Sequence, residues 1–429
     1  MQNVLVVYNG YAPLEEHSFQ RIFDEMWRSK HGDDISFQFL KLEEDESIHG
    51  NLLGFLEAHK KVLDLYPHGA QLPDTIVYIH DAGMSKRIFP LQYATGKPSK
   101  ALIRVPKGPA IAQTFHCMAH NLPFLKNTVM IIPIDQFFNY FDINVERLRE
   151  RVEQFGMVML QVDVPVATAV GQLGVTQMDP SGRIVAFFEK PKDPAMIPLV
   201  REGTALGNTF QVYFSHQGMQ GLLAAFEEFR KEEKKLAKEL DEAGWDFNGL
   251  VSETLTLPDA KLNVFQKAFK KHLKKHKIGL GGLEVKGTWQ DWASSLPVYF
   301  DFIKAQAPQM GAPDLEGNVW IRTEGIKIVT GDASNCIFID CDTVDLHGKF
   351  SDCVFVGCKK CRIAVATTAK GSIFANLFET NTLSVEANNQ VFAWGRTGRR
   401  KVFSITGFNE DYRELYDGPG SFVKGWWNV

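Results

Sequence analysis

The first part of the chain alternates short apolar runs with stretches in which apolar residues recur every three or four positions. Asn3–Tyr8 and Thr75–Ile79 are apolar and β-branched, as in buried strands, whereas Leu52–Leu65 has helical spacing. The rhythm continues with a helix expected over Ala110–Asn121 and a central strand over Thr128–Ile134. Strands that alternate with helices predict a mostly parallel, Rossmann-like sheet covered by helices.

The pattern extends to about residue 305 and includes one hairpin. A turn sequence, Asp179-Pro180-Ser181-Gly182, separates two expected strands at 174–178 and 183–188. A loop is expected over Trp289–Trp292. The remaining expected elements are strands over 35–40, 157–164 and 209–214, and helices over 18–30, 144–155, 217–242 and 265–277.

The pattern changes after Pro313, where short β-branched stretches replace the helical period. Asn335–Cys341 is repeated as Asp352–Cys358, 17 residues on, and Gly371–Asn376 follows about 19 residues later. Short strands at this period predict the coils of a parallel β-helix, taken here as left-handed. The aromatic residues near the C-terminus, Trp426 and Trp427, are expected to dock on the protein or on another subunit.

Composition limits the possible functions. At 429 residues the chain should hold two or three domains, and its net charge of −4 gives no general sign of nucleic-acid or membrane binding. No apolar run reaches the length of a membrane span, and six cysteines do not suggest a disulfide scaffold. A cytoplasmic protein is expected. The charged helices over 217–242 and 265–277 are interpreted as solvated faces.

A small-residue loop directly follows the Thr75–Ile79 strand and carries cations. It runs Asp81-Ala82-Gly83-Met84-Ser85-Lys86-Arg87, and Lys97 comes ten residues after Arg87. Bare backbone N–H groups and nearby cations can hold a polyphosphate. Taken alone, the stretch is equally consistent with an ordinary strand–turn carrying surface cations.

Three further stretches place polar side chains at the ends of expected strands. Asp135 follows the Thr128–Ile134 strand, where a carboxylate could hold Mg²⁺ or simply cap the loop. Glu189 and Lys190 end the second hairpin strand and could bind sugar hydroxyls and a phosphate, or form an exposed ion pair. Asp291 would be a second carboxylate for the same metal, or part of an aromatic-rich structural turn.

Together, in this order, the four stretches resemble the sugar-1-phosphate nucleotidyltransferases, or nucleotide-sugar pyrophosphorylases. The most specific part is LGVTQMDPSGRIVAFFEKP, from Leu173 to Pro191, and the likeness covers roughly residues 75–305. Many members add a C-terminal β-helix to an α/β catalytic domain. The resemblance implies an N-terminal extension of the catalytic sheet (1–75), a catalytic domain (76–312) and a β-helix domain (313–429), with homo-oligomers possible through the last.

The resemblance also implies a reaction and a site. A sugar-1-phosphate would attack the α-phosphate of a nucleoside triphosphate in line, and pyrophosphate would leave. Nucleic acid and membranes are not expected partners. The implied roles are catalysis for Arg87 and Lys97, nucleotide binding for Gly83, Ser85, Lys86 and Gly108, sugar-phosphate binding for Gly174, Glu189, Lys190 and Asn208, and Mg²⁺ binding for Asp135 and Asp291.

The loop departs from the family pattern Ala-Gly-Gly-x-Gly-Thr-Arg-Leu. Ala82 and Ser85 replace glycines, Lys86 replaces the threonine, and Asp81 adds a negative charge beside the expected phosphates. The Ser–basic–Arg sequence is closest to the fucose-1-phosphate guanylyltransferase branch, which favours GTP. The altered loop also fits an alternative, a catalytically inactive subunit of the same fold that binds nucleotide sugar and regulates a partner.

The cysteines allow one more alternative. Cys353, Cys358 and Cys361 have a spacing seen in iron–sulfur proteins, with Cys336 or Cys341 as a fourth ligand. Cysteines at the repeat spacing are more simply explained as small apolar side chains stacked inside a β-helix.

Overall fold

The fold is described from a computed structural model. It describes residues 2–10, 34–42, 50–66, 71–81, 100–101, 104–105, 108–171, 173–198, 203–294, 298–299 and 302, and the backbone of the short strands between Val319 and Gly407. The chain divides into two compact units. The first comprises Met1–Gly83 and Thr114–Trp289, and the second comprises Met84–Gln113 and Gln290–Val429.

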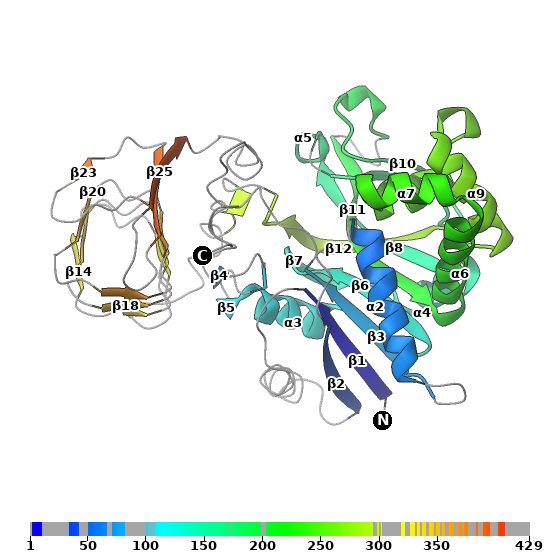
Figure 1. Ribbon diagram of the computed structural model, residues 1–429, viewed down its shortest axis with the longest axis horizontal. Helices are drawn as coiled ribbons and strands as arrows, with labels where there is room; N and C mark the ends of the chain where they lie inside the picture. Colours follow the sequence, from blue (N-terminus) through cyan, green and yellow to red (C-terminus); the bar gives the residue numbers. More distant parts are fainter. Residues whose placement is uncertain are drawn as a thin grey trace. The chain divides into compact units, whose positions relative to one another are not determined.

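The first unit is built on a ten-stranded mixed sheet with the order β2-β1-β3-β6-β11-β8-β12-β7, from which a β9–β10 hairpin branches at β11 (Figure 1). β2, β1, β3 and β6 are parallel, whereas β11 runs antiparallel to both of its neighbours, β6 and β8. The parallel part of the predicted sheet is therefore present, and the first 75 residues extend it through β1 and β2. The strands are β1 (Gln2–Asn9), β2 (Ile35–Leu42), β3 (Thr75–His80), β6 (Thr128–Pro133), β7 (Gln136–Asp142), β8 (Met157–Pro165), β9 (Val175–Met178), β10 (Ile184–Phe188), β11 (Thr204–Ser215) and β12 (Gly281–Asp291).

Helices cover both faces of this sheet. On one face, Phe55 of α2 packs against Tyr78 of β3 and Phe214 of β11, and α6 and α9 complete the same apolar cluster. On the other face, Phe115 of α3 contacts Phe39 of β2. The helices are α2 (Asn51–Leu65), α3 (Ala110–Asn121), α4 (Val145–Phe155), α5 (Val166–Ala169), α6 (His216–Glu232), α7 (Lys234–Ala243), α8 (Glu253–Thr256) and α9 (Val264–Lys275), with 3₁₀ turns at Pro194–Met196 and Asp259–Lys261 and a π-helix at Asn248–Ser252.

The helix predicted over 217–242 breaks in two at Glu233, so that prediction is wrong in this respect. The break lets α7 turn back, and Arg230 of α6 pairs with Asp241 of α7 at 2.9 Å. Asp241 also accepts a hydrogen bond from the indole of Trp245, whose ring is fully buried against Phe226. In one straight helix Arg230 and Asp241 would lie about 16 Å apart along the axis, so their pairing requires the break.

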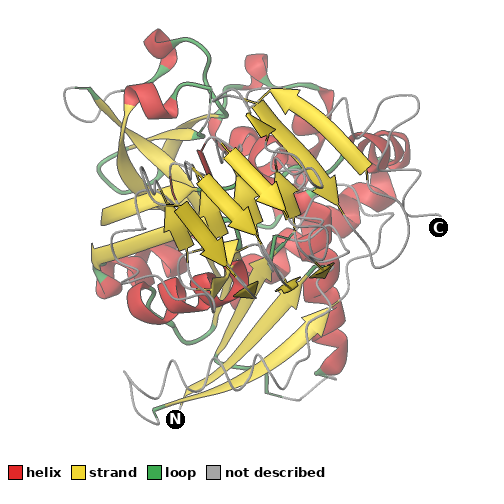
Figure 2. Cartoon of the chain, turned by 90° about the vertical axis from the view of Figure 1, so that its left-hand side faces the viewer, coloured by secondary structure: helices red, strands yellow, loops and turns green. Residues whose placement is uncertain are grey.

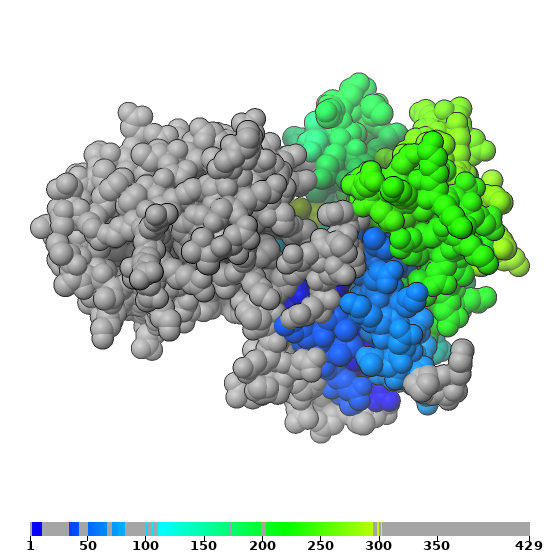
Figure 3. Space-filling model, in the orientation of Figure 1, coloured from blue at the N-terminus to red at the C-terminus, as the bar shows by residue number. Residues whose placement is uncertain are grey.

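The charged faces of α6 and α9, predicted to be solvated, are largely exposed and also form ion pairs with each other. Lys275 lies 2.8 Å from Glu228, and Lys271 lies 3.1 Å from Glu232. On the same side of the unit, α2 and α6 adjoin at the surface (blue and green in Figure 3), where Lys60 pairs with Glu227. The acidic and basic runs are therefore complementary.

The loop predicted at Trp289–Trp292 is also a wrong prediction, because β12 continues to Asp291. Leu283 and Val285 are buried and Glu284 and Lys286 are exposed, which is the alternation of a strand. Four glycines within 279–287 obscured this alternation in the sequence. Gly287, with φ of 151°, is needed because a Cβ there would lie 2.2 Å from the carbonyl oxygen of Asn139.

In the second unit, the described short strands form four sheets in which most neighbours are parallel, and the smallest sheet is the antiparallel pair β4–β5. Ile337 pairs with Val354, and Val354 pairs with Ile373, so the repeat seen in the sequence falls on neighbouring parallel strands (Figure 2). Its strands are β4 (Arg104–Val105), β5 (Gly108–Pro109), β13 (Val319–Ile321), β14 (Lys327–Thr330), β15 (Ala333–Ser334), β16 (Ile337–Ile339), β17 (Thr343–Leu346), β18 (Lys349–Ser351), β19 (Val354–Val356), β20 (Lys360–Ile363), β21 (Thr368–Lys370), β22 (Ile373–Ala375), β23 (Leu383–Ser384), β24 (Asn389–Trp394) and β25 (Val402–Gly407).

Candidate functional site

The carboxyl ends of β1, β3 and β6 meet at one edge of the first unit's sheet. The N–H of Asp81 donates to the carbonyl oxygen of Asn9 at 3.1 Å, and the N–H of Ile134 donates to that of His80 at 3.1 Å. Asp135 comes directly after Ile134, in the turn between β6 and β7, and is half-buried. Ligands of open α/β sheets bind beyond this edge, so Asp135 lies at the strand end that the sequence predicted for it.

Asp81 was expected to add a negative charge beside a phosphate-binding loop. Its carboxylate is 1% exposed and accepts a hydrogen bond of 2.7 Å from the hydroxyl of Tyr8. A side chain at Gly10 would collide with both partners, because its Cβ would lie 2.6 Å from the Tyr8 oxygen. Asp81 therefore links the ends of β1 and β3 inside the protein.

Asn208 is brought to the same edge by β11. The residue after Asp135, Gln136, donates through its amide to the carbonyl oxygen of Thr209, the residue after Asn208. The register of β11 on β8 shifts between Asn208 and Val212, and Phe210 has φ of 55°. Residues 209–211 leave the ladder with β8 while Asn208 stays paired with Gln161, and bulges of this kind are common beside functional sites.

Three of the residues predicted to bind the sugar phosphate form one cluster, namely Gly174, Glu189 and Asn208. The N–H of Asn208 donates to the carbonyl oxygen of Gly174 at 2.8 Å. A Cβ at Gly174 would lie 3.1 Å from Oε2 of Glu189 and 2.8 Å from the ring of Phe187, so only glycine leaves room beside the carboxylate. The β9–β10 hairpin supplies this geometry, because Val175 pairs with Phe188, and Gly174 and Glu189 are the next residues outward on the two strands.

Asn248 joins the cluster and was not found from the sequence. Its side-chain amide donates to Oε2 of Glu189 at 3.1 Å, and its side-chain oxygen lies 3.5 Å from the amide of Asn208. Asn248 opens the π-helix Asn248–Ser252, a rare element that often occurs at functional sites. The Asn248-Gly249 dipeptide indicates only a turn in the sequence, and nothing in it points to Glu189, 59 residues away.

Glu189 is electrostatically unusual. Burial raises its pKa to about 7, with further raising by Asp246 and Glu253, against the lowering effects of Lys190 and of the Asn248 hydrogen bond. The Lys190 ammonium lies 3.9 Å from Oε1 of Glu189, too far for a hydrogen bond. Lys190 itself has φ of 46°, an uncommon conformation for a residue with a side chain. A strongly perturbed carboxyl in a strained, polar cluster is a candidate binding group.

The other predicted site residues lie in different places. Gly108 is in β5, opposite Val105 of β4, and Asp291 is the last residue of β12, two residues past the end of the first unit. The described side chain of Asp291 accepts a hydrogen bond from the N–H of Ala293 at 3.0 Å. The remaining predicted residues lie outside the described part of the chain: Gly83, Ser85, Lys86, Arg87 and Lys97.

Comparisons with known proteins give distant matches only. No family model matches the sequence. No curated protein matches it either. Among solved structures, the chain is similar to a mannose-1-phosphate geranyltransferase from Thermus thermophilus, at 14% identity and a TM-score of 0.33 over 90% of this chain and 95% of that one. It is also similar to an apo UDP-glucose pyrophosphorylase, at 11% identity and a TM-score of 0.32 over 72% of this chain and 82% of that one. Similarity of this size does not establish a common function.

None of the helices in the described part of the chain combines the length and the apolar composition needed to cross a bilayer.

Proposed function

We propose that this protein is a sugar-1-phosphate nucleotidyltransferase. The observation that carries the proposal is the cluster of Gly174, Glu189, Asn208 and Asn248, which the hairpin and the β11 bulge assemble at the sheet edge next to Asp135. It combines a carboxylate and two amides, groups that accept and donate hydrogen bonds to sugar hydroxyls, and Gly174 leaves its backbone in close contact with the Glu189 carboxylate.

In the proposed reaction, a phosphate oxygen of the sugar-1-phosphate attacks the α-phosphorus of the nucleoside triphosphate. A new P–O bond forms as the bond between the α-phosphorus and its bridging oxygen breaks, and pyrophosphate leaves with that oxygen. Little covalent chemistry falls to the protein, so positioning and charge neutralisation supply most of the rate. Glu189 and Asn248 orient the sugar, and Lys190 neutralises its phosphate.

Asp135 and Asp291 are the proposed Mg²⁺ ligands. The donor set fits this ion, because Mg²⁺ takes one or two carboxylates and completes its shell with waters and phosphates, and Asp135 is a half-buried carboxylate at a strand end. When bound, the ion would offset negative charge on the triphosphate. Arg87 and Lys97 are proposed to act on the triphosphate, and Gly83, Ser85, Lys86 and Gly108 to bind the nucleotide.

Finer parts of the proposal rest on the sequence motifs. The Ser–basic–Arg loop favours GTP, as in the fucose-1-phosphate guanylyltransferase branch. The parallel pairing of Ile337 with Val354 and of Val354 with Ile373 supports a β-helix in the second unit, through which copies of the chain could associate. A cytoplasmic location is proposed with it.

The experiment is a matrix of four nucleoside triphosphates against several sugar-1-phosphates, with Mg²⁺, read by pyrophosphate release. Release with one pair far above the rest is expected. The altered loop, with Ala82, Ser85 and Lys86, favours a second candidate, the inactive nucleotide-sugar-binding subunit. Calorimetric binding of a nucleotide sugar without pyrophosphate release from any pair would establish that candidate instead.

A further inference from the structure

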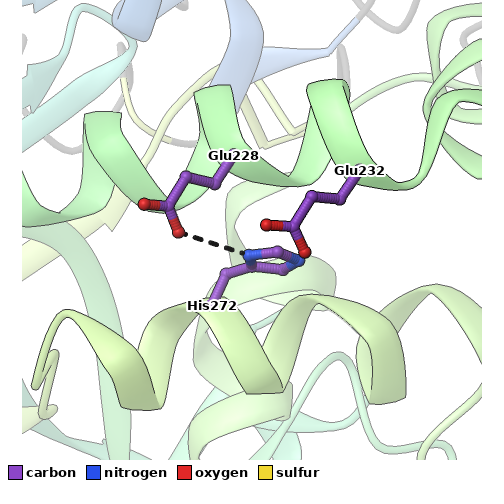
Figure 4. Close-up of side chains that lie close together, drawn as sticks. All are labelled: Glu228, Glu232 and His272. Carbon is purple, nitrogen blue, oxygen red and sulfur yellow. Dashed lines mark ion pairs between the residues drawn. The ribbon is translucent and has the colours of Figure 1, made fainter.

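Two helices on one side of the sheet bring metal-ligating side chains together, away from the proposed catalytic residues in sequence. Glu228 and Glu232 lie one turn apart on α6, and His272 faces them from α9 (Figure 4). One carboxylate oxygen from each glutamate and one ring nitrogen of the histidine all lie within 4.8 Å of one another. Residues at i and i+4 share a helix face, so this arrangement follows from the helical spacing.

The burial of His272 distinguishes this cluster from a surface ion-pair network. Its side chain is 1% exposed, and its ring lies between the two glutamates in Figure 4. Nδ1 is 3.6 Å from Oε2 of Glu228, and Nε2 has no hydrogen-bond partner among the described residues. Buried ring nitrogens are normally satisfied, and a neutral imidazole nitrogen is also a common metal ligand.

A second histidine lies beside these three candidate metal ligands. His276 follows His272 by one helical turn, and its Nε2 lies 3.2 Å from the same Oε2 of Glu228. Two ligands of a tetrahedral zinc ion, each bound at about 2.0–2.2 Å, lie about 3.3–3.5 Å apart. The 3.2 Å from Nε2 of His276 to Oε2 of Glu228 and the 3.6 Å from Nδ1 of His272 to the same oxygen are close to this value. Nε2 of His272, unpaired within the described part of the chain, is the other candidate ligand atom of that ring. The Glu232 side chain is 45% exposed and can rotate to bring its carboxylate within bonding distance of an ion held by the other ligands.

Lysines compete for the same carboxylates. Lys275 pairs with Glu228, and Lys271 pairs with Glu232, but their side chains are 59% and 69% exposed. Each can therefore turn into water without leaving a buried charge. His272 cannot leave in this way, because its side chain is enclosed between the helices.

We propose that Glu228, Glu232 and His272, with His276 beside them, bind a divalent transition-metal ion of the zinc type between α6 and α9. Imidazole nitrogen combined with carboxylate oxygen suits zinc and its neighbours, whereas Mg²⁺ prefers oxygen ligands alone. The bound ion would join the two helices that cover one face of the sheet. This site is independent of the proposed enzymatic activity.

The test uses the full chain and two probes. Cobalt(II) is titrated and followed by its d–d absorption, and zinc is titrated by calorimetry. We expect saturable binding without a sulfur-to-cobalt charge-transfer band, which excludes the cysteines as ligands. Glu232→Gln should weaken binding at least tenfold, because it removes one anionic ligand from a partly exposed position where the fold does not depend on it.

The matched control is Glu227→Gln, since Glu227 neighbours Glu228 on α6, is 54% exposed, and pairs instead with Lys60. This variant should bind both ions as the unmodified chain does. His276→Asn provides a second arm and should also weaken binding. Absence of binding by the unmodified chain would overturn the proposal. A sulfur-to-cobalt charge-transfer band that Glu232→Gln leaves unchanged would also overturn it. Equal zinc affinities of Glu232→Gln and Glu227→Gln would do the same.

Discussion

Two regions of the first unit hold glutamates in opposite electrostatic states. Glu189, at the sheet edge, is 30% exposed, and burial raises its pKa to about 7. Glu228, between α6 and α9, has a similar exposed fraction of 29%, but a hydrogen bond from Lys275 helps to lower its pKa to about 2. The side-chain exposed fractions are alike, so the difference lies in the surroundings: burial among protein atoms, with Asp246 and Glu253 nearby, raises the pKa of Glu189, whereas the Lys275 hydrogen bond lowers that of Glu228.

The difference shows which region is organised for packing and which for binding. Around Glu228, the Lys275 ammonium lies at 2.8 Å and the two helices gain mutual attraction. Around Glu189, the Lys190 ammonium is 3.9 Å away while Asp246 and Glu253 add negative charge, so the folded protein holds this carboxyl at a cost. A group kept at a cost to stability is most readily explained by a ligand that uses it.

The largest expected effect lies at the sheet edge. Asp135→Ala should lower turnover by about 100- to 1,000-fold, because it removes a proposed ligand of the Mg²⁺ ion that offsets phosphate charge, and electrostatic stabilisation of this kind is worth roughly 2.7–4 kcal/mol. Asp142→Ala, at the exposed end of β7, is the control and should keep normal turnover. Pyrophosphate release at saturating Mg²⁺ measures both, and wild-type turnover in Asp135→Ala would remove this residue from the site.

The next largest expected effect is the pH dependence that Glu189 gives to the free energy of unfolding. Its pKa is raised from 4.5 to about 7, so the folded chain keeps a proton that the unfolded chain releases. The free energy of unfolding should therefore fall as pH rises from about 4.5 to about 7, by at most about 3 kcal/mol. Glu189→Gln should lack this fall, whereas the control Glu153→Gln on α4 should retain it. Urea titrations at several pH values measure the difference, and parallel pH curves for wild type and Glu189→Gln would contradict it.

Lys190 should show a smaller and more selective effect. Lys190→Asn keeps a residue that tolerates φ of 46° and removes the ammonium. We expect sugar-1-phosphate affinity to weaken about ten- to a hundredfold, from a charge-assisted contact worth roughly 1.5–3 kcal/mol, with little change in triphosphate affinity. Exposed Lys192→Asn is the control. Steady-state kinetics and calorimetry separate the two substrates, and equal weakening of both would show that Lys190 is assigned to the wrong one.

Much of the first unit's fold was predictable, because local pattern and tertiary contacts agree there. The predicted helix over Ala110–Asn121 matches α3, and the turn sequence at 179–182 does join two antiparallel strands. The errors occur where tertiary contacts override the pattern. The helix breaks at Glu233, where Arg230 and Asp241 pair across the two segments, and close approach at Gly287 places glycine inside a strand. The helix predicted over 18–30 lies outside the described residues.

The candidate site was predictable only for residues that the family resemblance or a strand end indicated. The hairpin motif indicated Gly174 and Glu189 together, and a strand end indicated Asp135. Asn248 meets Glu189 through a π-helix, and Tyr8 meets Asp81 across 73 residues. Such pairs depend on how distant segments pack, and single-sequence patterns hold no record of that packing.

The smallest expected effect is at the helix pair. Lys275→Gln removes an exposed partner of Glu228, so it should lower the unfolding temperature slightly at low salt. The difference from wild type should vanish near 1 M NaCl, where the Debye length falls to about 3 Å. Lys238→Gln, exposed on α7, is the control and should change little in either condition. The same variant also separates the helix pair from the sheet edge. Because Lys275 competes for the Glu228 carboxylate, its removal should raise zinc affinity. Pyrophosphate release should stay unchanged. Weaker zinc binding in Lys275→Gln would contradict this competition and would mean that the lysine instead supports the carboxylate geometry of the site.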